Sequence, residues 1–481
     1  MNRVLFFTFG ELNILGERMS RKFLVLSALA LGLIVPASAK VYTRDEAVQT
    51  AMENSADIKT AEEDLIKASS QVDAGYGNAY PSIDLSANIT RIFGLKDVKN
   101  GTPITDAAQD SSMDASKFDK NVLAPAIDKM VNGMSAQGYR WQSSVGLTLT
   151  QVLYAAGKVG TAIDIAKAYK HLQEVNLENV KSTVRYNIDQ AFDGFIMIDS
   201  SMAIIDESLK LYENNLEFVK QQYQSGLATE LEVASIQLKM DALSIDRKTL
   251  EEQRLTAKNA LLTLMGVDYD KDVQFIGELR NPDSNLPFPD TSMANIIKRR
   301  KELVMLDAKE AMTEKNIEIE EGGYKPTIAL VGGLKYANNQ NKITEWDAPK
   351  WDKLNKYVAL SLTMNLFNGM QTKEAVVQAK SSLRSTQIQK ESTIRYIRLQ
   401  IENNVKALEN RERNLVVLKG NVELAERIYQ MTEAAYQNGM KSQLELLAAN
   451  LDLRNAKNNY LKGIMQWNEA YNALLKTTGE Y

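Results

Sequence analysis

The sequence predicts a mainly α-helical fold with a transmembrane β-barrel portion, in which long coiled-coil helices occur twice along the chain. Three observations lead to this fold class. Apolar residues keep a heptad-like period over residues 180–223. The same pattern returns at an offset of 213 residues, over 397–436. Four other stretches alternate between polar and apolar residues, which is the period of a β-strand.

The period of residues 180–223 is that of a left-handed coiled coil. After Val184 the apolar residues step by four and three in turn, an average of about 3.5, and few globular helices hold that register for so long. These residues are Val184, Ile188, Ala191, Phe195, Ile198, Met202, Ile205, Leu209, Tyr212, Leu216, Val219 and Tyr223. Most of the equivalent positions in 397–436 are also apolar, so the register itself is duplicated.

Composition excludes several classes of function. The chain has 481 residues, a net charge of −4, one histidine and no cysteine. A slightly acidic chain gives no reason to expect nucleic acid as a partner. Without cysteine there are no disulfides or thiolate metal sites, and a single histidine excludes zinc sites with two histidines. We expect no catalytic, cofactor or metal site.

The first 39 residues predict a signal peptide. Arg21 and Lys22 precede an apolar run over 23–35, and the small residues of 37–39 form a cleavage site, so the mature chain is expected to begin at Lys40. Met19 fits the translation start better than Met1. Beyond Lys40 no stretch is apolar enough for a transmembrane helix, and any membrane span must therefore consist of strands.

The first repeat is expected over residues 40–266. It begins with a helix over 43–75 and continues with a pair of strands, 80–93 and 141–154. A long helix then runs to Gly226, where glycine is expected to end it, and a second helix returns to Gly266. The loop 94–140 between the strands is long and polar, and an amphipathic pattern inside it predicts a short helix.

The second repeat is expected over residues 291–481, after a proline-containing linker over 267–290. Its strand pair lies at 326–336 and 357–367, and its long helix ends at Gly439, from which a helix returns to Gly479. Proline is absent between Pro125 and Pro282 and after Pro349, which leaves both long helices uninterrupted.

The alternating stretches admit two interpretations. A soluble antiparallel sheet with one wet face gives the same alternation. A continuous apolar face and aromatic residues at the strand ends favour a membrane barrel, with Asp84 and Lys335 on the polar face and Arg91 near a strand end. Four strands cannot close a barrel, and lipid does not tolerate open edges, so several chains must contribute to one barrel.

The order of these elements and four short motifs resemble the TolC family of outer-membrane efflux and secretion channels. The motifs are Tyr80-Pro-Ser-Ile83, Tyr324-Lys-Pro-Thr-Ile328, Tyr223-Gln-Ser-Gly-Leu227 and Tyr436-Gln-Asn-Gly-Met440. The resemblance covers essentially all of residues 40–481. It implies a homotrimer in which twelve strands form an outer-membrane barrel and twelve helices form a periplasmic tunnel.

The resemblance also implies partners and site residues. Hairpin tips at Gly226, Leu227, Gly439 and Met440 would contact a periplasmic adaptor (membrane fusion) protein, which is served by an inner-membrane transporter. The gate and constriction would be formed by Glu232, Tyr436, Lys441 and Glu445, with a link between Lys441 and Glu232. The family's second acidic ring falls at Ala448, which would weaken cation selectivity. Ordinary solvated charges at helix starts are the alternative interpretation.

We therefore expect a passive channel-tunnel of the outer membrane that extends into the periplasm of a Gram-negative-type envelope. It would be the exit duct of a tripartite efflux pump or type I secretion system for small toxic compounds or polypeptides. The alternative is a periplasmic structural or adaptor coiled coil with a soluble β-domain. An enzyme is the least favoured class, because the sequence contains no catalytic constellation.

Overall fold

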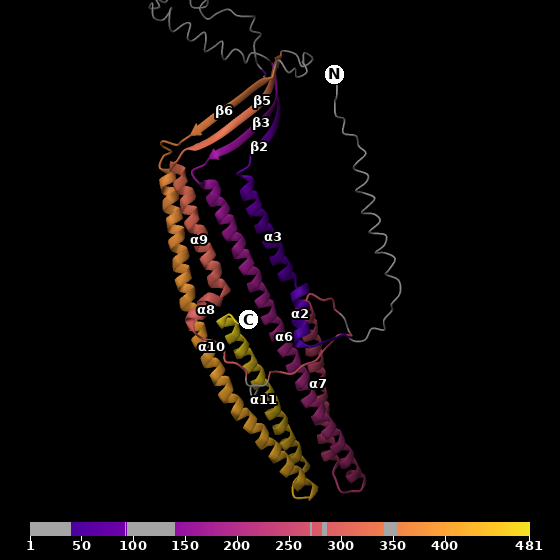
Figure 1. Ribbon diagram of the computed structural model, residues 1–481. Helices are drawn as coiled ribbons and strands as arrows, with labels where there is room; N and C mark the ends of the chain where they lie inside the picture. The colour runs from indigo at the N-terminus through magenta and orange to yellow at the C-terminus, as the bar shows by residue number, and fades with distance from the viewer. Residues whose placement is uncertain (1–39, 92, 94–139, 270–271, 281–285, 341–353) are drawn as a thin grey trace, which may run out of the picture. The chain divides into compact units, whose positions relative to one another are not determined.

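The computed structural model describes the chain except residues 1–39, 92, 94–139, 270–271, 281–285 and 341–353 (Figure 1). The expected signal peptide and the short helix in the loop 94–140 lie outside the described residues. The chain divides into two compact units. The coil unit contains the described part of Met1–Lys59 together with Val180–Thr291 and Gln400–Tyr481, and the sheet unit contains Thr60–Asn179 and Ser292–Leu399.

Two helices of 67 residues each, α6 (Lys158–Gln224) and α10 (Gln371–Gln437), belong to both units. At 1.5 Å per residue each is about 100 Å long. α6 buries several of the predicted heptad positions, among them Ile188, Phe195 and Tyr212, together with Phe192 and Ile196 beside the stripe. α10 buries Ile397, Leu408 and Leu415. The coiled-coil prediction is confirmed. Among the described residues no helix has both the length and the apolarity to cross a membrane.

The sheet unit contains an antiparallel four-stranded sheet in the order β2-β3-β5-β6. Its strands are β2 (Ser82–Arg91), β3 (Trp141–Tyr154), β5 (Thr327–Gln340) and β6 (Asn355–Thr363). β5 runs further than its apolar alternation predicts, because its last residue pairs with the first residue of β3. β6 ends earlier than expected, because Thr363 already faces Thr327, the first residue of β5.

The register of the sheet places most of the apolar side chains of the four strands on one face. Leu85 lies opposite Leu147, which lies opposite Leu334, and the same parity continues into β6. The exposed residues of this face include Ile83, Leu85, Ile89, Leu147, Val358, Leu360 and Leu362. Asp84 and Lys335 both fall on the opposite face, as predicted. An exposed apolar face of this extent needs a hydrophobic environment or a partner to cover it.

Aromatic side chains make two specific contacts in this sheet. Gly333 faces Tyr357 across the strand pair, and a Cβ at Gly333 would come 2.7 Å from the Tyr357 ring, so only glycine leaves room for this aromatic side chain. At the end of β2, the Arg91 guanidinium lies 4.6 Å from the centroid of the Phe93 ring and 5.2 Å from that of the Trp141 ring. Two aromatic rings therefore contact a charge that shares the apolar parity.

The single helix predicted over 43–75 is wrong, because two helices, α2 (Arg44–Asn54) and α3 (Ala56–Gly77), replace it. The backbone of Ser55 is extended, with ψ of 131°. Gly266 approaches the Asn54 carbonyl so closely that a Cβ would lie 2.4 Å from the oxygen. The second repeat breaks at the equivalent residue, Arg300, between α8 (Met293–Arg299) and α9 (Lys301–Glu321).

The coil unit also contains a small sheet that the sequence did not predict. Strand β1 (Val41–Tyr42) pairs in parallel with β4 (Gln274–Phe275), which lies in the expected linker. Phe275 packs against the rings of Tyr42, Phe192 and Phe195, at centroid distances of 5.3–6.1 Å. This aromatic cluster attaches the linker to α6.

Two returning helices complete the coil unit, α7 (Glu230–Leu264) and α11 (Gln443–Thr478). One apolar cluster joins α6, α7 and α11 through Ile205, Tyr212, Leu216, Val219, Ile236, Leu243 and Leu447. A second joins α10 and α11 through Leu408, Leu415, Trp467, Tyr471 and Leu474. Side-chain packing in these two clusters therefore holds the helices of this unit together.

Candidate functional site

The two helix hairpins of the coil unit turn in the same way. Gly226 and Gly439 have φ of +75° and +72°. At each turn the glycine N–H and the next N–H donate to carbonyls of the preceding helix, as in Leu227 N–Gln222 O and Met440 N–Ala435 O, both 2.8 Å. This is the Schellman arrangement, which needs a left-handed residue at the glycine. The side chains of Leu227 and Met440 at the tips are exposed.

A capping box starts each returning helix. The Thr229 hydroxyl caps the Glu232 N–H, and the Glu232 carboxylate accepts hydrogen bonds from the Thr229 backbone N–H at 2.7 Å and from its hydroxyl at 3.0 Å. Ser442 and Glu445 form the same pair at α11, at 2.8 and 3.0 Å. Both predicted gate carboxylates therefore have a structural role at a helix N-terminus.

The structure brings two of the four predicted gate residues into direct contact. Lys441 forms an ion pair with Glu445, and this contact is the main reason why the pKa of Glu445 is lowered to about 2, with the Ser442 hydrogen bonds as further causes. Within the described chain Lys441 thus pairs with Glu445 and not with Glu232. The two residues are four positions apart in the sequence, with Lys441 directly before Ser442, the N-cap of α11.

The remaining two predicted gate residues, Tyr436 and Glu232, interact through charge. Burial, and after it the negative charge of Glu232, raises the pKa of the Tyr436 phenol. The end of α10 and the start of α7 therefore influence each other electrostatically, although the structure gives no hydrogen bond between these two side chains.

Tyr436 also lines a cleft of ≈ 420 Å³ that lies within the coil unit. Its lining comes from α6, α10 and the start of α11 and comprises Glu207, Lys210, Leu211, Asn214, Asn215, Phe218, Tyr429, Glu433, Tyr436, Gln437 and Leu446. The Tyr429 hydroxyl donates to Glu433 at 3.2 Å, and burial together with this carboxylate raises the Tyr429 pKa. Sequence reasoning placed Tyr429 only on the coiled-coil stripe and did not identify the cleft.

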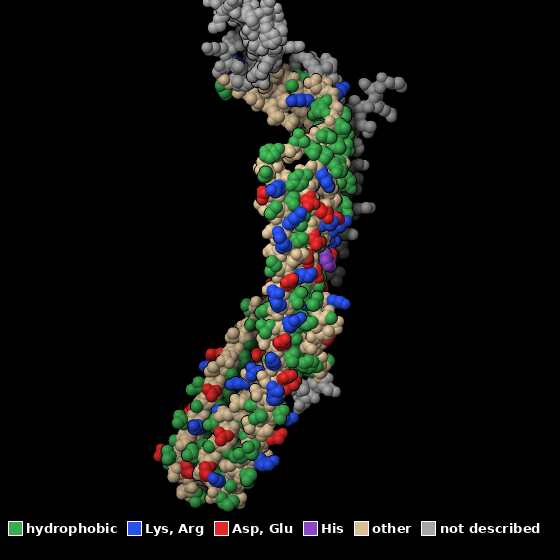
Figure 2. All heavy atoms as spheres, turned by 90° about the vertical axis from the view of Figure 1, so that its left-hand side faces the viewer, with side chains coloured by type: hydrophobic (Ala, Val, Ile, Leu, Met, Phe, Trp, Pro, Cys, Tyr) green, Lys and Arg blue, Asp and Glu red, His purple; other side chains and the backbone are tan. Residues whose placement is uncertain are grey.

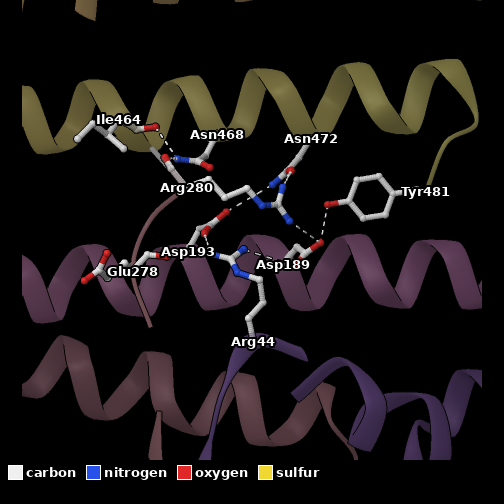
Figure 3. A network of polar contacts seen from close by, with 9 residues as sticks. All are labelled: Arg44, Asp189, Asp193, Glu278, Arg280, Ile464, Asn468, Asn472 and Tyr481. Atoms are coloured by element: carbon white, nitrogen blue, oxygen red, sulfur yellow. Dashed lines mark hydrogen bonds and ion pairs between the residues drawn. The ribbon is translucent and has the colours of Figure 1, made fainter. Parts of the chain in front are cut away.

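A buried network of charges lies elsewhere in the coil unit (Figure 3). Arg44 of α2 contacts both Asp189 (3.4 Å) and Asp193 of α6, whose side chains are 3% and 1% exposed. From the other side, Arg280 Nη2 lies 3.3 Å from Asp189 Oδ2, and the Tyr481 hydroxyl donates to the same oxygen at 2.7 Å. Two arginines therefore balance two buried carboxylates.

Amides of α11 complete this network. Asn472 bonds to Arg280 and to Asp193 Oδ2, and Asn468 Nδ2 donates to the Arg280 carbonyl at 3.1 Å. Burial raises the pKa of Asp193 against the opposing effect of Arg44. Burial would lower the pKa of Arg44, but Asp193 and Asp189 outweigh it and the pKa is raised. The network joins α2, α6, the segment after β4 and α11.

Sequence reasoning missed this network. The available signal was the pair Asp189 and Asp193, which lie one helical turn apart beside the apolar Ile188 and Phe192. Charges next to an apolar stripe are usually solvated, and here they are buried because α2, β4 with the chain after it, and α11 cover this face of α6.

The chain matches the family model described as outer membrane efflux protein over residues 47–267 and 293–480. It is 21% identical to "Outer membrane protein TolC" of Vibrio cholerae over 408 residues, which cover 80% of this chain and 91% of that protein. It is also 21% identical to "Nodulation protein T" of Rhizobium leguminosarum bv. trifolii over 285 residues, which cover 57% of this chain but only 58% of that protein.

The fold agrees with that of a solved channel. The crystal structure of CusC, described in terms of folding and transmembrane channel formation, has a TM-score of 0.70 to this chain at 16% identity and covers 91% of this chain and 92% of that one. At this identity the likeness is one of fold. Because the family model matches most of the sequence, the chain belongs to the outer membrane efflux protein family, a family of outer-membrane channel and transport proteins rather than enzymes.

Proposed function

We propose that three copies of this chain form an exit duct, through which small toxic compounds or polypeptides cross the outer membrane. Family membership supports transport at that membrane. The exposed apolar face of the four-stranded sheet supports contact with outer-membrane lipid. Since four strands leave two open edges, and lipid tolerates none, the barrel needs strands from further copies.

The duct would act with a periplasmic adaptor protein and an inner-membrane transporter. The observation that carries this proposal is the pair of identically closed hairpins, each with an exposed apolar residue at its tip. An exposed Leu227 or Met440 gains free energy when a partner covers it. We assign Gly226, Leu227, Gly439 and Met440 to the adaptor contact, the glycines because they shape the turns.

We assign the gate to Glu232, Tyr436, Lys441 and Glu445. Lys441 and Glu445 are held together at the start of α11, and Tyr436 lies within reach of the Glu232 charge. Trimer symmetry would bring three copies of these carboxylates around one axis, where they would attract cations. Ala448 stands at the second acidic position of the family, so the cation selectivity would be modest.

We further propose that residues 40–266 and 291–481 are equivalent repeats joined by the linker 267–290. The breaks at Ser55 and Arg300, the turns at Gly226 and Gly439 and the two capping boxes recur in the same order in both. A duplication would account for this order, since the same local signals specify the same element twice.

Single-channel conductance of the mature protein in a planar bilayer tests the duct and the gate together. We expect discrete, cation-selective steps that grow in Lys441→Ala and return to the original size in Lys441→Arg, which keeps the charge. Conductance steps of equal size in all three proteins would contradict the assignment of Lys441 to the gate, whereas the proposal of a duct would stand. A protein without channel activity that is soluble without detergent would instead be a periplasmic coiled-coil protein.

A further inference from the structure

The apolar face of the four-stranded sheet contains a hollow of ≈ 430 Å³. All four strands contribute to its lining, which comprises Ile83, Leu147, Leu149, Gly332, Gly333, Leu334, Lys356, Tyr357 and Val358. Ile83 and Val358 are 64% and 78% exposed, so the hollow is open to the surroundings of the sheet. An open apolar hollow on this face can take an apolar ligand such as an acyl chain.

Gly332 leaves the space that this hollow occupies. Its partners in the two neighbouring strands, Leu149 and Val358, carry side chains on the same face. The backbone does not require glycine here, because the strand pairing is regular at this row and a Cβ would meet only the Tyr357 carbonyl oxygen, at 3.8 Å. A strand glycine that forms no bulge and gives room to no neighbouring side chain is typical of a place where a ligand approaches the backbone.

In the described strands the apolar face carries positive charge and no negative charge. The charged residues of these strands are Asp84, Arg91, Lys335 and Lys356. Asp84 and Lys335 lie on the opposite face. Arg91 and Lys356 share the parity of Leu85 and so lie on the apolar face. In Figure 2 the acidic side chains lie along the helices, and the sheet shows hydrophobic and basic ones. The face therefore complements an anionic lipid.

Lys356 brings one of these charges to the hollow. It is the second residue of β6, lies opposite Leu334 and lines the hollow. A basic side chain on a lipid-facing surface is costly unless its ammonium group reaches lipid headgroups, which its long aliphatic chain allows. Val358 and Gly332 form the next row of the same face, two residues further along β6. An acyl chain that descends from a headgroup at Lys356 would therefore pass over Gly332.

The position of Lys356 along β6 selects the outer leaflet. β2 follows α3, β3 precedes α6, β5 follows α9 and β6 precedes α10, so the helical ends of all four strands lie at one edge of the sheet. In a channel that extends into the periplasm this edge faces inward, and Lys356 lies near the opposite end of β6. The lipid of the outer leaflet in a Gram-negative-type envelope is lipopolysaccharide, whose lipid A part carries both phosphates and acyl chains.

We propose that this hollow binds the lipid A part of lipopolysaccharide, with an acyl chain against Gly332 and a phosphate on the Lys356 ammonium group. The ammonium group donates charge-assisted hydrogen bonds to the phosphate oxygens. The acyl chain fills the space between Leu149 and Val358, where it gains van der Waals contacts that a flat strand surface would not give. This inference rests on the proposed outer-membrane duct, because only there does the sheet meet lipopolysaccharide.

Native mass spectrometry of the mature protein in detergent, titrated with lipid A, measures the affinity for the first bound lipid. We expect Lys356→Ala to weaken this affinity about tenfold and Lys356→Arg to restore most of it, because arginine also binds phosphate. Lys335→Ala is the matched control, since it removes an equal charge from the adjacent row of the opposite face. This control should leave the affinity unchanged.

Gly332→Leu tests the hollow independently of the charge. The strand can accept this side chain, since a Cβ at Gly332 meets no atom closer than 3.8 Å, and the new side chain would occupy the space of the acyl chain. We expect about tenfold weaker binding of lipid A. With dephosphorylated lipid A, Lys356→Ala should bind as the unmodified protein does, whereas Gly332→Leu should still bind more weakly.

Planar-bilayer conductance of the same variants separates this inference from the proposed function. A channel-forming protein whose affinity for lipid A is equal in all variants overturns the lipid A site and leaves the duct. Phosphatidylglycerol that binds as tightly, with the same dependence on Lys356, would assign the site to phospholipids and also overturn the inference. A protein without channel activity that is soluble without detergent overturns both. Lys356→Ala decides the question alone if Gly332→Leu does not fold.

Discussion

Lys441 pairs with one oxygen of the Glu445 carboxylate, while the other oxygen accepts hydrogen bonds from the backbone N–H and the hydroxyl of Ser442. The Glu445 side chain thus caps α11 and also binds the Lys441 ammonium group, as the gate proposal requires. The ion pair is exposed, so its strength depends on solvent and salt, whereas the cap is a local feature of the helix start.

The gate should resist moderate acid. Its contacts lower the pKa of Glu445 from 4.5 to about 2. A carboxylate whose folded pKa is depressed contributes its stabilisation above the unfolded pKa and loses it as the pH falls through the folded value. We expect Glu445→Gln to conduct more than the unmodified channel at neutral pH, and the difference to disappear only as the pH approaches about 2. Conductance that already converges near pH 5 would contradict this assignment.

The capping boxes should stabilise the starts of α7 and α11 to a similar degree. We expect Thr229→Ala and Ser442→Ala each to cost about 1 kcal/mol of local stability, because each leaves a first-turn N–H without its acceptor. Hydrogen exchange at the Glu232 and Glu445 amides measures this directly. Thr249→Ala, in the middle of α7 with its hydroxyl bonded to the Ile245 carbonyl, is the control and should not speed exchange.

The buried charge network should be the most sensitive part of the coil unit. Asp193→Asn removes one of the two buried carboxylates that Arg44 contacts, and we expect a loss of about 3 kcal/mol in the free energy of unfolding. Asp206→Asn breaks the exposed pair with Arg247 and should cost about 0–1 kcal/mol. Thermal unfolding followed by circular dichroism compares the two. Equal effects would mean that the network is not stabilised by its charges.

The turn glycines should be required for their backbone conformation alone. A Cβ at Gly226 or Gly439 would meet no atom within 4 Å, so Gly226→Ala and Gly439→Ala add only left-handed strain, about 1–2 kcal/mol. Gly194 lies inside α6 and a Cβ there is equally unobstructed. Gly194→Ala should therefore stabilise the protein by about 0.5–1 kcal/mol. Chemical denaturation of all three variants would reveal opposite signs, and a stabilising Gly226→Ala would contradict the assignment.

Those features that depend on a repeated local signal could be predicted from the sequence. The heptad period specified α6 and α10 because a helix buries one face along its whole length, and Gly226 and Gly439 marked their ends because the turn needs a positive φ. The strand alternation gave the apolar face of the sheet in the same way. The two interpretations of that alternation were separated by the comparisons and not by the pattern.

Tertiary structure decided which distant residues meet. The helix predicted over 43–75 breaks at Ser55 because Gly266 approaches the Asn54 carbonyl, and nothing near residue 55 encodes that approach. Arg44 meets Asp189 across 145 residues of sequence. Spacing along a chain fixes the face on which a side chain lies, but a contact between segments depends on how those segments pack. For this reason the sequence determined the two long helices, their glycine turns and the apolar face of the four-stranded sheet, whereas packing determined the break at Ser55 and the charge network.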